Sequence, residues 1–207
     1  GIKNPNLVGD TIKLEKNTFN AFNKMQIAAK NDGVDLKIAS AHRGYNRQKH
    51  IWNTKFKKFT TEFKLKPSQA VYEIIRFSTI PGTSRHHWGT EIDIIDSNYP
   101  DEEDVLISKK FEKDGIFFKV KNWLNINSEK FGFFITYNND PNRTGFDHEP
   151  WHYSYKPLSK IMLEEFKTID LIEFYSTLKL KGTEFITKDF LEDYKKENVL
   201  DINPDLE

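Results

Sequence analysis

The sequence predicts an α+β fold in which a small, mainly antiparallel sheet is flanked by helices. Apolar residues recur at helical spacing in several segments, and short runs with strand-like alternation lie between those segments. The resulting order is helix, strand, two helices, strand, helix and two strands. The 207 residues suit one domain, and a hydrophobic fraction of 37% provides enough apolar surface for a folded core.

The first half of the chain contributes three predicted helices and one strand. Apolar residues at helical spacing predict a helix over residues 17–32, which Gly33 ends. Alternation predicts a strand over residues 35–40 that leads into a glycine-containing loop. Asn46 is a candidate cap for the second helix, and Pro67 suits the first turn of the third. A loop that follows a strand is a common position for functional residues.

A lysine-rich segment, residues 54–66, separates the second and third helices. Its basic residues alternate with phenylalanines, which is typical of a solvated amphipathic surface. The chain carries 31 Lys and Arg against 31 Asp and Glu, so no net charge attracts a polyanion. We therefore expect no nucleic-acid partner.

The second half of the chain supplies the remaining strands. Residues 89–95 read as a strand entering the core, residues 119–130 as a helix, and residues 133–137 and 151–155 as two more strands. Beyond Pro157 the apolar spacing predicts a long helix through Ile161, Phe166, Ile172 and Phe174, and then a shorter helix through Phe190, Leu191 and Tyr194. This tail offers no candidate chemistry of its own.

The composition also limits the kinds of site and segment that the chain can contain. No apolar run approaches the ~18 residues that a membrane-spanning helix needs, so we expect no transmembrane segment. The chain has no Cys, so a metal site must be built from His, Asp and Glu. The sequence begins at Gly1, and we expect that a signal peptide has been removed from it.

Histidines cluster in the segments 40–48, 84–93 and 147–152, which together hold five of the six. Zinc in hydrolases typically takes three protein ligands and leaves a fourth position for water. His86, Asp93 and His152 can supply such a set, because Gly89 permits a sharp turn between the first two. Spacing alone indicates this weakly, since a lone His or a strand-end Asp more often has a structural role.

Two further residues fit hydrolytic chemistry at such a metal. Glu149 could take a proton from water and pass it to a leaving amine. In an extended strand Glu149 and His152 would face opposite ways, so the hypothesis requires a turn near Pro150. The guanidinium of Arg43 could hold a carboxylate or an oxyanion, and Gln48 could join it. Taken alone, Arg43 is better explained as an ion-pair or surface residue.

Three ordered blocks of sequence resemble a known family. They are SAHRGYNRQ at residues 40–48, PGTSRHHWGTEID at residues 81–93 and EPWHY at residues 149–153, with Gly-Phe at residues 132–133. In this order they are similar to the VanY-type D-alanyl-D-alanine carboxypeptidases of the peptidase M15 group, which are relatives of the lysostaphin and hedgehog zinc domains. The resemblance covers roughly residues 15–156.

The resemblance implies roles for individual residues of this chain. It places zinc ligands at His86, Asp93 and His152 and the catalytic base at Glu149. It also implies that Arg43 stabilises the tetrahedral intermediate and that substrate-binding residues lie at Ser84 and Gln48. The zinc is expected on the open face of the sheet. We therefore expect a zinc peptidase catalytic domain over 1–156 and a helical extension over 157–207 packed on the same domain.

The sequence departs from the family pattern at Glu91, where a small residue is usual. This extra carboxylate could tune the zinc, bind a substrate amine or anchor the fold. His87 is an alternative ligand because it adjoins His86, and His148 is expected to be a neighbour of the metal site or a loop residue.

The implied activity is that of a zinc metallopeptidase that removes a C-terminal D-alanine from peptidoglycan stem peptides, outside the cytoplasm. An L,D-carboxypeptidase or an endopeptidase, including a phage-type lysin, would share the zinc chemistry. The Glu-Pro-Trp-His block argues against the lysin, whose block is a shorter Asp-x-Pro-His. Two non-catalytic alternatives are a hedgehog-like zinc-binding module and a structural domain without metal. Intact Glu149 and Arg43 argue against the zinc-binding module.

Overall fold

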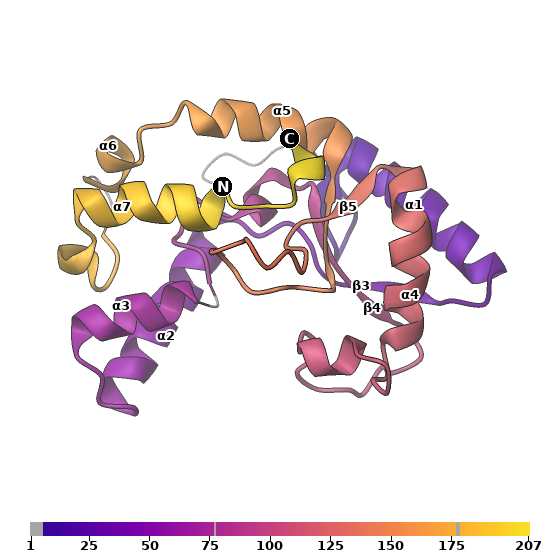
Figure 1. The fold of residues 1–207 in the computed structure, drawn as a ribbon, viewed down its shortest axis with the longest axis horizontal. Coiled ribbons are helices and arrows are strands. Elements are labelled where there is room, and N and C mark those ends of the chain that lie inside the picture. The colour runs from indigo at the N-terminus through magenta and orange to yellow at the C-terminus, as the bar shows by residue number, and fades with distance from the viewer. Residues whose placement is uncertain (1–5, 77, 177–178) are drawn as a thin grey trace.

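The computed structural model describes residues 6–76, 78–176 and 179–207. Its main sheet has four antiparallel strands in the order β3-β4-β6-β5: Leu36–Ser40, Glu91–Asp96, His152–Tyr155 and Phe133–Ile135. Helices lie around this sheet (Figure 1), so the predicted α+β class is confirmed. A separate hairpin of β1 (Leu7–Val8) and β2 (Leu14–Glu15) was not predicted, because strands of two residues show no alternation.

One face of the sheet is apolar and packs on two helices. Ile92 and Ile94 of β4 and Tyr153 of β6 share a core with α1 (Lys16–Asn31) and α4 (Phe118–Asn127). Figure 1 shows these two helices on the same side of the strands. Since successive side chains of a strand point to opposite faces, the residues between these isoleucines point to the other face. That face carries the candidate site.

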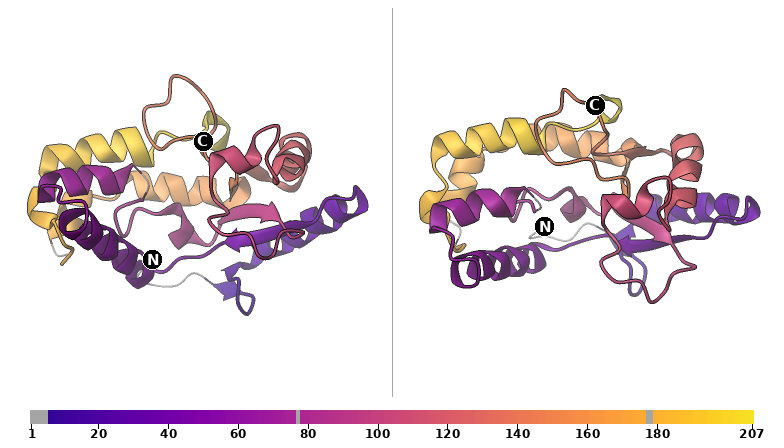
Figure 2. Two further views of the ribbon diagram at one scale, coloured as in Figure 1. Left: turned by 90° about the horizontal axis from the view of Figure 1, so that it is seen from below. Right: turned by 60° about the horizontal axis from the view of Figure 1, so that its bottom comes forward.

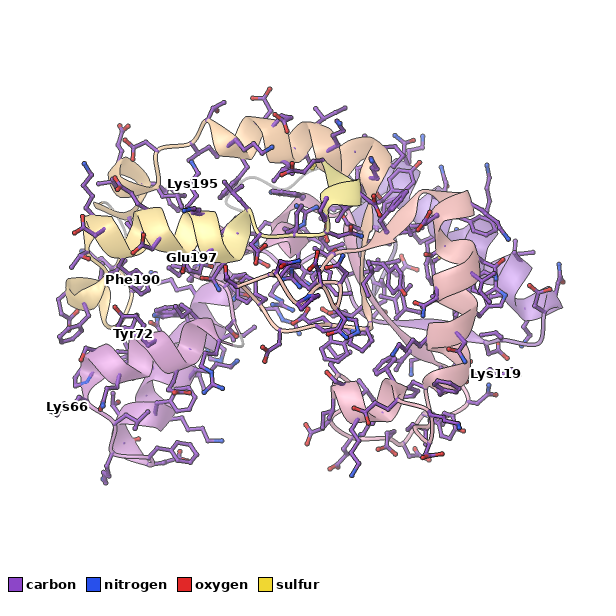
Figure 3. All side chains as sticks on the ribbon, viewed as in Figure 1. Lys66, Tyr72, Lys119, Phe190, Lys195 and Glu197 are labelled. Atoms are coloured by element: carbon purple, nitrogen blue, oxygen red, sulfur yellow. The ribbon has the colours of Figure 1, made fainter. Side chains whose placement is uncertain are left out.

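A second core joins the remaining helices. It contains buried residues of α2 (Tyr45–Thr61), α3 (Pro67–Ile75), α5 (Lys156–Lys167), α6 (Leu171–Ser176) and α7 (Lys188–Tyr194). Figures 1 and 2 show α7 running beside α3, and Figure 3 shows Tyr72 of α3 next to Phe190 of α7. Their rings meet edge to face with centroids 5.3 Å apart. The helices beyond residue 157 therefore share a core with the first half of the chain.

The largest residue of this second core gives a stability prediction. Trp52 is fully buried, and its indole nitrogen donates a hydrogen bond of 2.9 Å to the Lys181 carbonyl. Trp52→Ala is expected to lower the free energy of unfolding by about 3–5 kcal/mol through lost burial and the cavity it leaves. Urea denaturation measures this. Ile161→Ala, at a side chain that is 60% exposed, is the control, and an equal effect of both variants would contradict the packing described.

Two sequence predictions about helix boundaries are wrong. The second helix begins at Tyr45 after the cap residue Gly44, whose carbonyl accepts from the Gln48 amide, so Asn46 lies inside the first turn. The predicted long helix of the tail is interrupted between α5 and α6. Asp170 Oδ1 accepts from the Ile172 and Glu173 amides and starts a new helix there. The break was not predicted because the helical spacing of apolar residues continues across it.

A lysine side chain satisfies the carbonyls at this break. Lys195 Nζ, labelled in Figure 3, donates to the carbonyl oxygens of Lys167 and Ile169. The lysine-rich segment 54–66 forms the end of α2 and the turn into α3; Phe56 and Phe59 pack against the second core, and Phe63 is exposed. Within the described ranges, no helix has the length and apolar character required to cross a membrane.

Candidate metal centre and active-site cavity

Adjacent strands and a short helix bring the predicted metal ligands together. Asp93 of β4 is paired with His152 of β6, and cross-strand partners point to the same face of a sheet. His86 lies in a 3-10 helix, Arg85–Trp88, which ends at Gly89 with φ 75°, so the chain turns directly into β4. One ligand atom from each of His86, Asp93 and His152 can be chosen so that all lie within 4.8 Å of one another.

The hydrogen bonds of the two imidazoles leave one nitrogen of each directed at this common point. His86 Nδ1 donates to the Ala41 carbonyl at 2.8 Å, so Nε2 faces Asp93 Oδ2 at 3.5 Å. His152 Nε2 lies 2.9 Å from Glu91 Oε2, and Nδ1 points to the other side, where it lies 3.5 Å from Asp93 Oδ1 and 3.0 Å from Glu149 Oε2. When the second ring nitrogen is engaged in this way, the tautomer and orientation of a metal-binding histidine are fixed.

The electrostatics of the three residues fit a divalent cation. Burial raises the pKa of Asp93 to about 7, and its Oδ1 has no hydrogen-bond partner among the described residues. Burial and the Arg43 charge hold the pKa of His86 well below its usual value, so this ring is neutral. Burial lowers the pKa of His152, but hydrogen bonds to Glu149 and Glu91 outweigh it and raise the pKa to about 10. The site therefore stabilises added positive charge, and its nitrogen and oxygen donors suit zinc.

Glu149 reaches the same point through a tight turn. Its carbonyl accepts from the His152 amide at 3.1 Å, and the chain turns through Pro150 and Trp151. This is the turn that the hypothesis required. As a result, Glu149 Oε2 lies 3.0 Å from His152 Nδ1, and the part-exposed carboxylate lines the cavity.

Arg43 also lines this cavity and is held by its neighbours. Its amide donates to the His86 carbonyl at 3.1 Å, and Nη1 donates to Gln48 Oε1 at 2.9 Å. Gln48 is fully buried, and its amide nitrogen donates to the Thr79 carbonyl at 2.8 Å. Gln48 therefore contacts Arg43 from behind, whereas Arg43 itself lines the cavity.

The candidate site opens into a cavity of about 400 Å³. The predicted ligands, Glu149, Arg43 and Ser84 all contribute to its lining. Leu106, Ile107 and Trp151 add apolar surface, and Arg76 and Arg85 add two further guanidinium groups. The cavity can thus accept a peptide end that carries both an apolar side chain and a carboxylate, next to a carboxylate base and a metal position.

The structure places the other histidines outside the ligand set. His87 Nδ1 donates to the Arg43 carbonyl and Nε2 accepts from the Gly82 amide, so backbone groups hold both nitrogens, and His87 is not among the residues whose ligand atoms converge. His148 Nδ1 donates to the Tyr137 carbonyl beside the cavity. Tyr137, whose ring centroid lies 5.1 Å from that of His152, was missed, although its position at the end of a predicted strand gave a signal.

Comparisons with known proteins identify the family of the chain. Residues 11–158 match the VanY family, described as D-alanyl-D-alanine carboxypeptidase. A putative carboxypeptidase of Bacillus subtilis, YodJ, is 29% identical over 171 residues, which are 80% of this chain and 55% of that protein. A D-alanyl-D-alanine carboxypeptidase of Enterococcus faecalis is 35% identical over 132 residues, 62% of this chain and 42% of that protein. The chain thus spans about half the length of these two relatives.

Solved structures show the same likeness. VanYB in complex with D-alanine-D-alanine is 25% identical with a TM-score of 0.59, over 86% of this chain and 91% of that chain. A VanY D,D-pentapeptidase variant in complex with Zn(II) has a TM-score of 0.58 at 25% identity, over 83% of this chain and 89% of that one. The LdcB LD-carboxypeptidase has a TM-score of 0.57 at 25% identity, over 86% and 80%. The chain belongs to the VanY family of D-alanyl-D-alanine carboxypeptidases.

Proposed function

We propose that this chain is a zinc-dependent D,D-carboxypeptidase that removes the C-terminal D-alanine from peptidoglycan stem peptides. The observation that carries the proposal is the convergence of the Glu149 carboxylate and the Arg43 guanidinium on a cavity beside His86, Asp93 and His152. The family match and the solved relative in complex with D-alanine-D-alanine support this substrate class.

The residues divide the chemistry of amide hydrolysis between them. Zinc held by His86, Asp93 and His152 would supply Lewis-acid activation of water and of the scissile carbonyl. Glu149 accepts a proton from the attacking water and returns it to the amine of the departing D-alanine as the carbon–nitrogen bond breaks. Arg43 donates hydrogen bonds to the oxygen on which negative charge develops. Ser84 lines the cavity and is proposed to contact the substrate.

Action on stem peptides implies a place of action outside the cytoplasm, where peptidoglycan is assembled and trimmed. This location is part of the proposal and follows from the substrate. An L,D-carboxypeptidase is the second candidate, because the LdcB structure matches as well as VanYB, with TM-scores of 0.57 and 0.59. The two activities share the metal and the base and differ in the pocket that receives the penultimate residue.

The experiment incubates the zinc-loaded protein with muropeptides ending in a pentapeptide or in a tetrapeptide and follows product masses. Loss of one alanine from the pentapeptide is expected. Loss from the tetrapeptide alone would establish the L,D activity instead. Absence of both products despite bound zinc would refute the carboxypeptidase and favour an endopeptidase or a zinc-binding module.

Removal of the metal is expected to abolish the reaction. The uncoordinated ligand set leaves Glu149 without activated water, so treatment with a chelator should reduce product formation to background. Added zinc should restore it. Magnesium added after chelation serves as the control, because a site with two imidazoles is a poor one for magnesium. Activity that persists after complete zinc removal would contradict the mechanism.

We propose that residues 157–207 form an extension that packs on the catalytic domain, residues 1–156, because hydrogen bonds join the two parts. Tyr194 of α7 accepts a hydrogen bond from the Ile80 amide at 3.0 Å, and Tyr175 of α6 donates to the Pro81 carbonyl at 2.8 Å. Both contacts hold the segment that leads to Ser84 and His86. We propose that the extension supports this wall of the cavity and is part of one catalytic unit.

A further inference from the structure

Glu91 is a buried carboxylate directly behind the candidate metal centre. It has no exposed surface and lies in β4 two residues before Asp93, so it shares the site face of the sheet. Its Oε2 lies 2.9 Å from His152 Nε2 and accepts from the Thr136 hydroxyl at 3.2 Å. Its Oε1 accepts from the hydroxyls of Ser154 at 2.5 Å and Thr90 at 3.1 Å. Both oxygens are therefore fully engaged by the protein.

This environment excludes one of the roles that the sequence left open. Glu91 is absent from the cavity lining and is covered on all sides, so a substrate amine cannot reach it without unpacking the sheet. The partner that links Glu91 to the chemistry is His152. The nitrogen that faces Glu91 is the one that points away from Asp93, because Nδ1 is the nitrogen that faces Asp93.

A buried arginine balances the charge of Glu91. Arg85 Nη2 lies 3.4 Å from Glu91 Oε1 and donates to the Ser154 hydroxyl at 3.0 Å. The guanidinium lies 4.5 Å from the centre of the Trp88 ring, which covers it. Removing a single member of such a buried pair leaves an uncompensated charge, whereas Arg85 and Glu91 together form a neutral, ordered unit. This unit holds the carboxylate next to the His152 ring.

We propose that Glu91 is a positioning residue that fixes His152 with its Nε2 protonated and its Nδ1 directed at the zinc. The inference rests on the proposed function, because it assigns the same three ligands. A carboxylate that accepts the second N–H of a metal-binding imidazole fixes its tautomer and orientation and raises its basicity. Glu91 would thus strengthen zinc binding without touching the zinc or the substrate.

Zinc affinity of Glu91→Gln, measured by competition with a chromogenic chelator, tests the proposal. The amide keeps the size of the side chain but removes its charge, and the zinc dissociation constant is expected to rise by about 10- to 100-fold. Asp96→Asn is the matched control. Asp96 is a buried carboxylate at the other end of β4 that accepts from Asn98, away from the site, so this variant should bind zinc as the wild type does.

A second variant covers the case in which Glu91→Gln fails to fold because Arg85 loses its counter-ion. Arg85→Met combined with Glu91→Met removes both charges, a replacement that buried ion pairs often tolerate. Its zinc affinity should fall as in the single variant. Nitrogen NMR of the zinc-loaded wild type should show His152 protonated at Nε2, with slow proton exchange that the variants lose.

The outcomes separate this inference from the proposed function. Wild-type affinity in a folded variant that lacks the Glu91 carboxylate would overturn the positioning role and leave the peptidase proposal intact. An NMR signature of His152 protonated at Nδ1 would overturn it as well. A wild-type protein that binds no zinc would overturn both proposals.

Discussion

Glu149→Ala is expected to lower the rate of D-alanine release by about 10²–10⁴-fold while the protein keeps its zinc. The carboxylate lines the cavity and lies 3.0 Å from His152 Nδ1, yet it is not needed to complete the ligand set of His86, Asp93 and His152. Its loss removes the group that transfers the proton and leaves the ligands in place. The measurements are the release of D-alanine from pentapeptide muropeptide and the zinc content of the purified variant.

Glu164→Ala is the control for this prediction. Glu164 is a surface carboxylate of α5 that pairs with Lys167 and does not line the cavity, so its loss should leave both readouts unchanged. A Glu149→Ala protein with wild-type turnover would contradict the role of general base. If turnover and zinc were lost together, Glu149 would instead belong to the metal ligands.

The sheet was predictable because its strands carry strong local patterns. Each main-sheet strand was expected within a few residues of its observed position, since one face of the sheet is apolar and its alternation is visible in Ile92, Ile94 and Tyr153. The break before α6 was not predictable from periodicity. It depends on the Asp170 cap and on Lys195, which comes from a distant part of the chain to bind the carbonyls of Lys167 and Ile169.

The candidate site was predictable in its residues and less so in its geometry. The ordered blocks indicated His86, Asp93, Glu149 and His152 together, but no block says which imidazole nitrogen faces the metal. That choice is made by partners remote in sequence, such as the Ala41 carbonyl for His86. Gln48 illustrates the same limit. It was expected to bind substrate, and the structure shows both ends of its amide bonded to Arg43 and Thr79.

The same buried geometry makes the metal-free site costly to the fold. Asp93 is only 2% exposed, and its Oδ1 has no hydrogen-bond partner among the residues that the structure describes. Burial raises the pKa of Asp93 to about 7 although the His152 and Arg43 charges oppose this shift, so the fold disfavours the ionised carboxylate, and a bound cation would stabilise it. Ligands of this kind reduce stability when the site is empty and increase it when the metal is bound.

Asp93→Asn is therefore expected to abolish the stabilisation by zinc without lowering the metal-free free energy of unfolding. For the wild type, zinc at 1,000 times its dissociation constant should add about 4 kcal/mol. The variant should lose this increment, because a neutral amide neither completes the ligand set nor needs a counter-charge. Urea denaturation with chelator and with zinc measures both quantities.

Asp96→Asn separates this effect from the general loss of a buried carboxylate. Asp96 accepts two hydrogen bonds from Asn98 and lies in the same strand, so its replacement should cost metal-free stability, of the order of 1 kcal/mol, and leave the zinc increment intact. The two variants of this strand are therefore expected to differ in opposite ways: Asp93→Asn loses the stabilisation by zinc, and Asp96→Asn loses stability without zinc. If Asp93→Asn kept the full stabilisation by zinc, Asp93 would not be a ligand. If the variant instead had a much lower free energy of unfolding without zinc, other residues of the fold would already stabilise the Asp93 carboxylate.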